Sequence, residues 1–90
     1  MLLEVAVSGT VGKQTIPTTQ QVILKHITLT PSAANATIKI RDGNASGEVV
    51  LFARAHTSGG SKCIEACHKF TKGMHVKVVG TNAVAYLVLE

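Results

Sequence analysis

The chain has few of the residues on which most catalytic sites and nucleic-acid platforms depend. It contains no tryptophan, one tyrosine, two phenylalanines and five acidic residues in 90. Five dispersed acids suggest no paired-carboxylate site, and Gly59-Gly60 stands alone instead of in a phosphate-binding loop. A protein that binds single-stranded nucleic acid usually stacks bases on aromatic side chains, which are scarce here. We therefore expect a non-enzymatic protein without cofactors.

Long apolar runs and a secretory start are also missing. No apolar run approaches the roughly 18 to 20 residues needed to cross a bilayer, and the N-terminus lacks the basic start of a signal peptide. We expect a protein made in the cytoplasm that does not enter a membrane. The Asn35-Ala36-Thr37 and Asn44-Ala45-Ser46 sequences match glycan acceptor sites, but without a secretory signal we interpret them as chance matches.

The composition that remains is that of a small folded domain. Hydrophobic residues make up 46% of the chain and the mean hydropathy is +0.29, which excludes a disordered protein. A chain of this size forms one domain, residues 1–90, with a small core and marginal stability. Self-association, as a dimer or trimer, would add to that stability.

Short alternating segments separated by turn residues predict an all-β fold. Ile38 and Ile40 alternate with Lys39 and Arg41, for example, which is the two-residue period of a half-buried strand. The predicted strands span residues 2–7, 22–30, 35–42, 48–57, 74–79 and 83–90, and residues 62–70 form a strand or a short helix. Six to eight short strands favour a single antiparallel β-sandwich or a jelly-roll-like barrel.

The last two strands are predicted to form a hairpin around Gly80-Thr81-Asn82. The second of them is apolar on both faces. Ala85, Leu87 and Leu89 supply one face and Val84, Tyr86 and Val88 the other. Since a small chain has only one core, we predict that Val84, Tyr86 and Val88 contact another subunit.

Residues 8–21 predict an extended N-terminal arm. They contain two glycines, one proline and four threonines, and a loop of this length in a small domain is unusual unless a neighbour holds it. We predict that the arm becomes ordered only in an assembly, with Ile16 and Pro17 at the interface.

Cys63, Cys67 and His68 invite a zinc hypothesis, with His26, His56 or His75 as further ligands. In a strand, however, positions four apart lie about 13 Å apart, too far for one metal ion or a disulfide. In a helical turn the site would be feasible. We predict reduced, packed cysteines and no metal, with a combined cost of roughly 1 to 3 kcal/mol for replacing both. Cys67 and His68, adjacent in sequence, would point to opposite faces of a strand and could not act as a nucleophile and its base.

The net charge of +4 and the pI near 9.4 are compatible with a polyanionic partner. The basic residues are scattered along the sequence, with one concentration between residues 62 and 77. We interpret them mainly as solvated strand positions and predict no specific nucleic-acid partner. The alternative is a basic nucleic-acid-binding β-barrel, in which Lys62, Lys69, Lys72 and Lys77 line a groove.

Several segments resemble small all-β virion proteins of tailed bacteriophages, which decorate or cement a capsid or build part of the tail. The resemblance spans residues 22–90 and rests on Ala36-Thr37-Ile38-Lys39-Ile40-Arg41-Asp42-Gly43, on Gly47 and the strand after it, on Phe70-Thr71-Lys72-Gly73-Met74-His75-Val76, and on the Gly80 turn into residues 83–90. It implies a capsid decoration (cement) protein, located in the virion and bound in many copies to the major capsid protein or another virion protein. A tail or head-fibre component is the alternative within this group.

Overall fold

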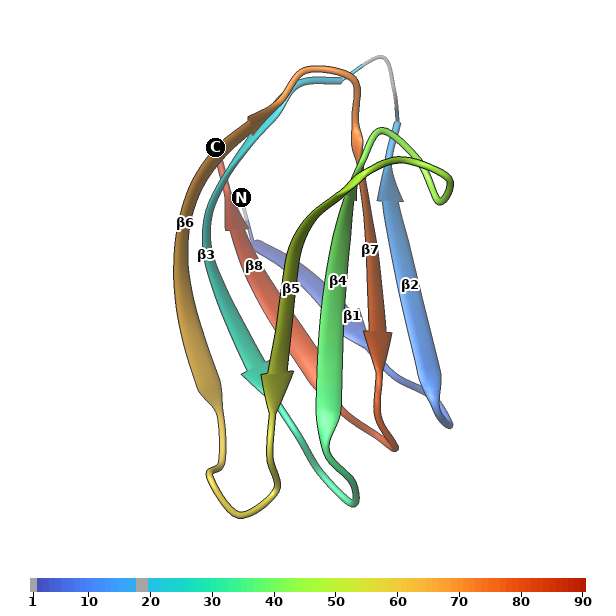
Figure 1. Cartoon of the computed structure of the whole chain (residues 1–90), viewed down its shortest axis with the longest axis vertical. Helices are drawn as coiled ribbons and strands as arrows, with labels where there is room; N and C mark the ends of the chain where they lie inside the picture. Colours follow the sequence, from blue (N-terminus) through green and yellow to red (C-terminus); the bar gives the residue numbers. More distant parts are fainter. Residues whose placement is uncertain (1, 18–19) are drawn as a thin grey trace.

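The computed structural model describes residues 2–17 and 20–90, which form eight β-strands in two antiparallel sheets (Figure 1). Sheet A has the strand order β1-β8-β3-β6 and sheet B the order β2-β7-β4-β5. The strands are β1 (Leu2–Ala6), β2 (Val11–Ile16), β3 (Val22–Thr30), β4 (Ala36–Asp42), β5 (Val49–Ala55), β6 (Lys62–Phe70), β7 (Met74–Val79) and β8 (Val84–Leu89).

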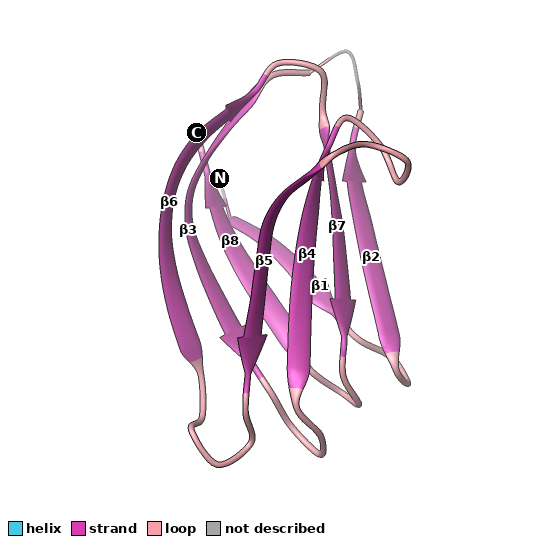
Figure 2. Cartoon of the chain, viewed as in Figure 1, coloured by secondary structure: helices cyan, strands magenta, loops and turns pink. Residues whose placement is uncertain are grey.

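The strand order is that of an eight-stranded jelly roll. Each sheet draws its strands from both halves of the chain, and successive strands cross repeatedly from one sheet to the other. Strands and loops account for all the described residues, without a helix (Figure 2). The predicted all-β, jelly-roll-like sandwich is therefore confirmed, and β6 resolves the ambiguity at residues 62–70 in favour of a strand. None of the described segments is a helix that could span a membrane.

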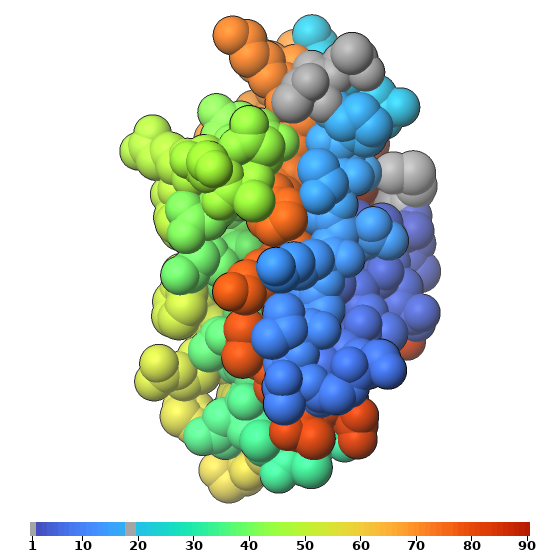
Figure 3. All heavy atoms as spheres, turned by 90° about the vertical axis from the view of Figure 1, so that its right-hand side faces the viewer, coloured from blue at the N-terminus to red at the C-terminus, as the bar shows by residue number. Residues whose placement is uncertain are grey.

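The core lies between the inner faces of the two sheets. Alternation along each strand sends every second side chain inward, so both sheets contribute. The largest fully buried side chains are Phe70, Leu24, Ile27, Leu29, Ile38, Ile40, Met74, Leu87, Leu89, Val5, Val76 and Val78. Figure 3 views the sandwich from the side at which β1 and β2 lie next to each other.

The predicted hairpin of the last two strands is wrong, although both strands exist. β7 pairs with β2 and β4 in sheet B, whereas β8 pairs with β1 and β3 in sheet A. Gly80 and Asn82 both have positive φ angles, of 148° and 56°, in the turn that carries the chain across. The predicted turn at Gly80-Thr81-Asn82 does exist, but it connects a strand of one sheet to a strand of the other instead of two paired strands.

The predicted arm over residues 8–21 also needs correction. Residues 11–16 form β2, which pairs with the whole length of β7. Its backbone hydrogen bonds and the buried Ile16 hold it in the fold without a partner chain. The sequence does not predict this strand because glycine, at Gly12, occupies one of its few inward positions. The segment therefore shows little alternation of apolar and polar residues. Residues 18 and 19 of the predicted arm lie outside the described residues.

Candidate binding faces

The outer face of sheet A divides into an apolar half and a polar half. Strand register aligns the outward side chains in rows that run from β1 across β8 and β3 to β6. One row holds Leu2, Val88, His26 and Glu65, and the next holds Glu4, Tyr86, Thr28 and Cys63. We call Leu2, Ala6, Val84, Tyr86 and Val88 the apolar half, and the outward residues of β3 and β6 the polar half.

The apolar half leaves large side chains in contact with solvent. Leu2 is 63% exposed and Val88 39% exposed, and these two residues face each other across β1 and β8. Val84 and Tyr86 are half-buried because β8 has a neighbouring strand on each side. β1 is an edge strand of sheet A, so one side of its backbone has no strand partner. An apolar edge of this kind is a surface on which another chain can pack or add a strand.

Tyr86 lies at the centre of the apolar half and has one acidic neighbour. A hydrogen bond with the side chain of Glu4 raises the pKa of Tyr86, as do the negative charge of Glu4 and partial burial. The phenol therefore stays neutral and presents an uncharged ring on this face.

The five residues predicted at the interface do not all meet. Val84, Tyr86 and Val88 do share the outer face of sheet A. Ile16, in contrast, is only 8% exposed and belongs to the core, so its assignment to an interface is wrong. Pro17 is exposed where β2 ends in the other sheet and is not part of the apolar half.

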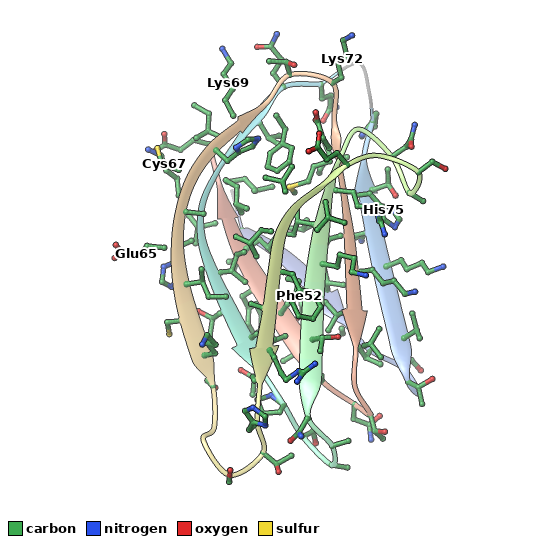
Figure 4. All side chains as sticks on the ribbon, viewed as in Figure 1. Phe52, Glu65, Cys67, Lys69, Lys72 and His75 are labelled. Atoms are coloured by element: carbon green, nitrogen blue, oxygen red, sulfur yellow. The ribbon has the colours of Figure 1, made fainter. Side chains whose placement is uncertain are left out.

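The outer face of sheet B combines basic side chains with the exposed apolar residues Val11, Val49, Phe52 and Val79. Register places Lys13 of β2, Lys77 of β7 and Lys39 of β4 directly beside one another, and we call these three residues the lysine row. Phe52 of β5 continues the row beyond Lys39. The ammonium nitrogen of Lys39 lies 5.8 Å from the centre of the Phe52 ring, which is 52% exposed. Figure 4 labels Phe52 on β5 and His75 towards the opposite side of the sheet.

Two arginines flank the lysine row. Arg54 and Thr37 lie in the neighbouring row on one side, and Arg41 and His75 in the row on the other. Five of the nine lysines and arginines thus gather on one face, although they are scattered in the sequence. These five residues do occupy outward strand positions, as predicted, but their gathering on one face was not predicted.

The acidic side chains of the described residues form no ion pair with the basic residues of this face. Glu4 and Glu65 point outward from sheet A, and Glu90 follows β8. Asp42 ends β4 and Glu48 precedes β5. Within residues 2–17 and 20–90 the one ion pair joins Lys25 and Glu90, at 3.7 Å. The lysine row therefore has no ion-pair partner among the described residues.

The alternative groove predicted from Lys62, Lys69, Lys72 and Lys77 does not form. Lys62 and Lys69 belong to β6 in sheet A, Lys72 lies in the loop after β6, and Lys77 belongs to sheet B. Lys69 and Lys72 extend from the same end of the sandwich in Figure 4. Lys77 instead lies between Lys13 and Lys39 in sheet B.

His75 is the one buried polar residue of the basic face. Its Nδ1 atom lies 2.9 Å from the hydroxyl oxygen of Thr15 in the adjacent strand. Burial is the main reason why the pKa of His75 lies below its ordinary value of 6.5. Three neighbouring cations, Lys13, Arg41 and Lys77, lower this pKa further.

This lowered pKa predicts a stability that falls on acidification. Below about pH 6.5 the unfolded chain binds a proton at His75 that the folded protein resists, so the free energy of unfolding decreases until the folded pKa is passed. His75→Gln should show a smaller loss of stability between about pH 7 and pH 5 in denaturant titrations. His56→Gln, in the exposed segment after β5, is the control and should behave like the wild type. Equal pH dependence of wild type and His75→Gln would contradict the prediction.

The two cysteines are exposed, so the prediction that they are packed is wrong. Cys63 and Cys67 point outward from β6, whereas Ile64, Ala66 and Phe70 face the core side. Cys67 extends away from the sandwich in Figure 4. His68 packs edge-on against Phe70, with 4.5 Å between ring centres, and so does not join Cys67.

Exposure changes the expected cost of replacing the thiols. The Cys63→Ser, Cys67→Ser double variant should unfold within about 0.5 kcal/mol of the wild type, as is usual for surface positions, and less than the sequence suggested. Both thiols should also react with a thiol reagent in the folded protein. Ile64→Ser, in the same strand but against the core, should cost more than about 1 kcal/mol. A double variant that is less stable than Ile64→Ser would overturn this view of β6.

Two further sites were candidates for chemistry. A hollow of about 390 Å³ opens beside the loop between β5 and β6 and is lined by Arg54, His56, Lys62 and Cys63 together with Gly59, Gly60 and Ser61. Its lining contains no carboxylate. No group of three or more His, Cys, Asp or Glu side chains that could hold a metal ion occurs in the described part of the chain. That the protein works without metal stays a prediction.

No protein-family model matches the chain, and the comparison with curated proteins finds no match. Solved structures match at the level of the fold. A structure of disulfide-linked pili, the Bacillus endospore appendages, is 14% identical over 99% of this chain and 81% of its own, with a TM-score of 0.58. The Drosophila NLP core, described as a histone-binding pentamer, is 7% identical over 100% of this chain and 96% of its own, with a TM-score of 0.62.

A third similar structure is a domain of a collagenase. The pre-peptidase C-terminal domain of a Bacillus anthracis collagenase is 8% identical over 100% of this chain and 88% of its own, with a TM-score of 0.53. At such low identities these likenesses show a shared β-sandwich and nothing about activity.

Proposed function

We propose that this chain is a non-enzymatic structural subunit that works in multiple copies and associates with itself through the apolar half of sheet A. The observation that carries the proposal is the exposure of Leu2 and Val88 around Tyr86, beside the edge strand β1. An outward sheet face with no partner would be expected to be polar, as it is on β3 and β6. Burial of these side chains at about 25 cal/mol per Å² would favour association.

The similar structures support a repeating role without identifying it. One forms pili and another a pentamer, so the same sandwich serves in at least two kinds of assembly. The small core of a 90-residue domain gives a further reason, because a partner would add buried apolar surface.

The finer proposal is a capsid decoration protein of a tailed bacteriophage. It rests on the resemblance of residues 22–90 to such virion proteins, and it makes the major capsid protein the second partner. Binding to purified capsids that lack decoration should saturate at one copy, or one small oligomer, per repeating capsid unit. A few copies per particle would instead favour the alternative, a tail or head-fibre component.

Tyr86→Asp should abolish self-association while leaving the fold intact. A carboxylate in a desolvated contact costs several kcal/mol, which corresponds to a dissociation constant at least about 100-fold higher. Sedimentation velocity should therefore show the wild type as an oligomer and the variant as a monomer. Reductant must be present, since Cys63 and Cys67 are exposed and could form disulfides between chains.

Thr28→Asp is the matched control for this experiment. Thr28 lies directly opposite Tyr86 in the same row but belongs to the polar half. It should keep the wild-type oligomer, and circular dichroism should show the same β-structure for all three proteins. A monomeric wild type, or equal effects of Tyr86→Asp and Thr28→Asp, would contradict an interface centred on the apolar half.

A further inference from the structure

We propose that the outer face of sheet B binds the sugar–phosphate backbone of single-stranded nucleic acid, without sequence specificity, through the lysine row and Phe52. This inference goes beyond self-association and uses the opposite face of the sandwich. Both faces can therefore be occupied at the same time.

The first argument is the uncompensated charge of the lysine row. Lys13, Lys77 and Lys39 are direct cross-strand neighbours, and strands lie about 4.8 Å apart. Like charges directly opposite each other in a sheet are destabilising. Among the described residues, no acidic side chain forms an ion pair with these lysines. A chain of phosphates would supply the missing counter-charge.

The second argument is the size and shape of the charged area. Arg54 and Arg41 extend it by one row on each side, and outward residues two apart along a strand lie about 6.6 Å from each other. The guanidinium of Arg41 donates a hydrogen bond to the carbonyl oxygen of Gly47 at 2.8 Å, which fixes its position beside the row. Several successive phosphates can thus meet cations without a change in the fold.

The third argument is Phe52, which distinguishes single-stranded nucleic acid from other polyanions. It is the more exposed of the two phenylalanines, and it lies at the end of the lysine row, next to Lys39. Proteins that bind single strands combine a basic track for the backbone with an aromatic ring on which a base stacks. An acidic protein surface would match the charge of the lysines equally well, but it offers no base to stack on the exposed ring of Phe52.

Fluorescence anisotropy with a labelled oligothymidylate of about 20 nucleotides tests the proposal, since a binding site spans about 4 to 16 nucleotides. The triple variant Lys13→Ser, Lys39→Ser, Lys77→Ser removes the lysine row. Each phosphate contact contributes about −0.7 to the slope of log affinity against log salt, so the slope should become shallower by about 2. Phe52→Leu should weaken binding about 5- to 100-fold, with an unchanged salt slope.

The matched control is Lys62→Ser, Lys69→Ser, Lys72→Ser, which removes the same number of charges from the other parts of the surface. It should keep nearly the wild-type affinity and salt slope. Equal losses in the two triple variants would show that net charge alone drives binding and would overturn the proposal. So would no binding by the wild type at low salt.

Two further probes separate the possible anionic partners. A duplex of the same length and polyglutamate should each bind more weakly than the oligothymidylate, and neither should be affected by Phe52→Leu. Polyglutamate binding as tight as that of the oligothymidylate would overturn the proposal in favour of an acidic protein surface. Because Tyr86→Asp lies on the other sheet, the monomeric variant should keep its binding per subunit, so failure of self-association does not decide this test.

Discussion

Phe70→Ala is expected to be among the most destabilising single substitutions in this protein. Phe70 is fully buried at the end of β6, where it pairs with Val22 and contacts the ring of His68. Truncating a buried phenylalanine costs about 3 to 5 kcal/mol, because the transfer free energy is lost and a cavity remains. For a domain of this size that is a large part of the total stability. Thermal unfolding should show a melting temperature lower by about 15 °C or more, or no cooperative transition.

Phe52→Ala makes the same chemical change on the surface. Its ring is half exposed, with the Lys39 ammonium nitrogen 5.8 Å from the ring centre, so the loss should stay near about 1 kcal/mol. Equal effects of Phe52→Ala and Phe70→Ala would mean that the two faces of the sandwich are assigned wrongly.

Gly73→Ala is expected to cost about 2 to 4 kcal/mol through the backbone. Gly73 has a φ angle of +83°, a conformation that costs other residues roughly 1 to 2 kcal/mol. A β-carbon there would also lie 2.4 Å from the carbonyl oxygen of Ile16 and 2.7 Å from that of Pro17. The amide of Gly73 donates to the carbonyl of Gln20, and its own carbonyl accepts from Gly43. A shift at this residue would therefore disturb the ends of β2 and β4 together.

Gly60→Ala separates the two contributions to that cost. Gly60 also has a positive φ angle, of 70°, but a β-carbon there would meet nothing within 4 Å. It should lose only the conformational part, roughly 1 to 2 kcal/mol, in denaturant titrations. A loss for Gly73→Ala no larger than that for Gly60→Ala would show that the close approach to Ile16 and Pro17 is unimportant.

Local patterns predicted most strands because inward and outward residues alternate within a few positions. Met74, Val76 and Val78 are buried as their spacing indicated, and Lys77 between them is exposed. β2 lacks this signal, since its inward positions include Gly12, and its stability comes from hydrogen bonds to β7, more than 50 residues away in the sequence. Such pairing leaves no trace in a short window of sequence.

For the candidate binding faces, too, local sequence patterns predict only what lies within one strand. The apolar outer side of β8 was predictable from one strand alone. The lysine row was not, because Lys13, Lys39 and Lys77 come from three separate strands and meet only through the register of sheet B. The hairpin prediction failed for a related reason: a turn fixes where a strand ends, while its partners are chosen by the whole sandwich.

The pairing of β1 with β8 also determines when this protein can fold. β1 pairs with β8, the last of the eight strands in sequence order, and β2 likewise pairs with the distant β7. On a ribosome, sheet B cannot be completed until β7 has emerged, and sheet A cannot be completed until β8 has emerged. Domains dominated by such distant pairings fold in milliseconds to seconds, far more slowly than helical bundles. A chain cut short before β8 would lose one of the two central strands of sheet A.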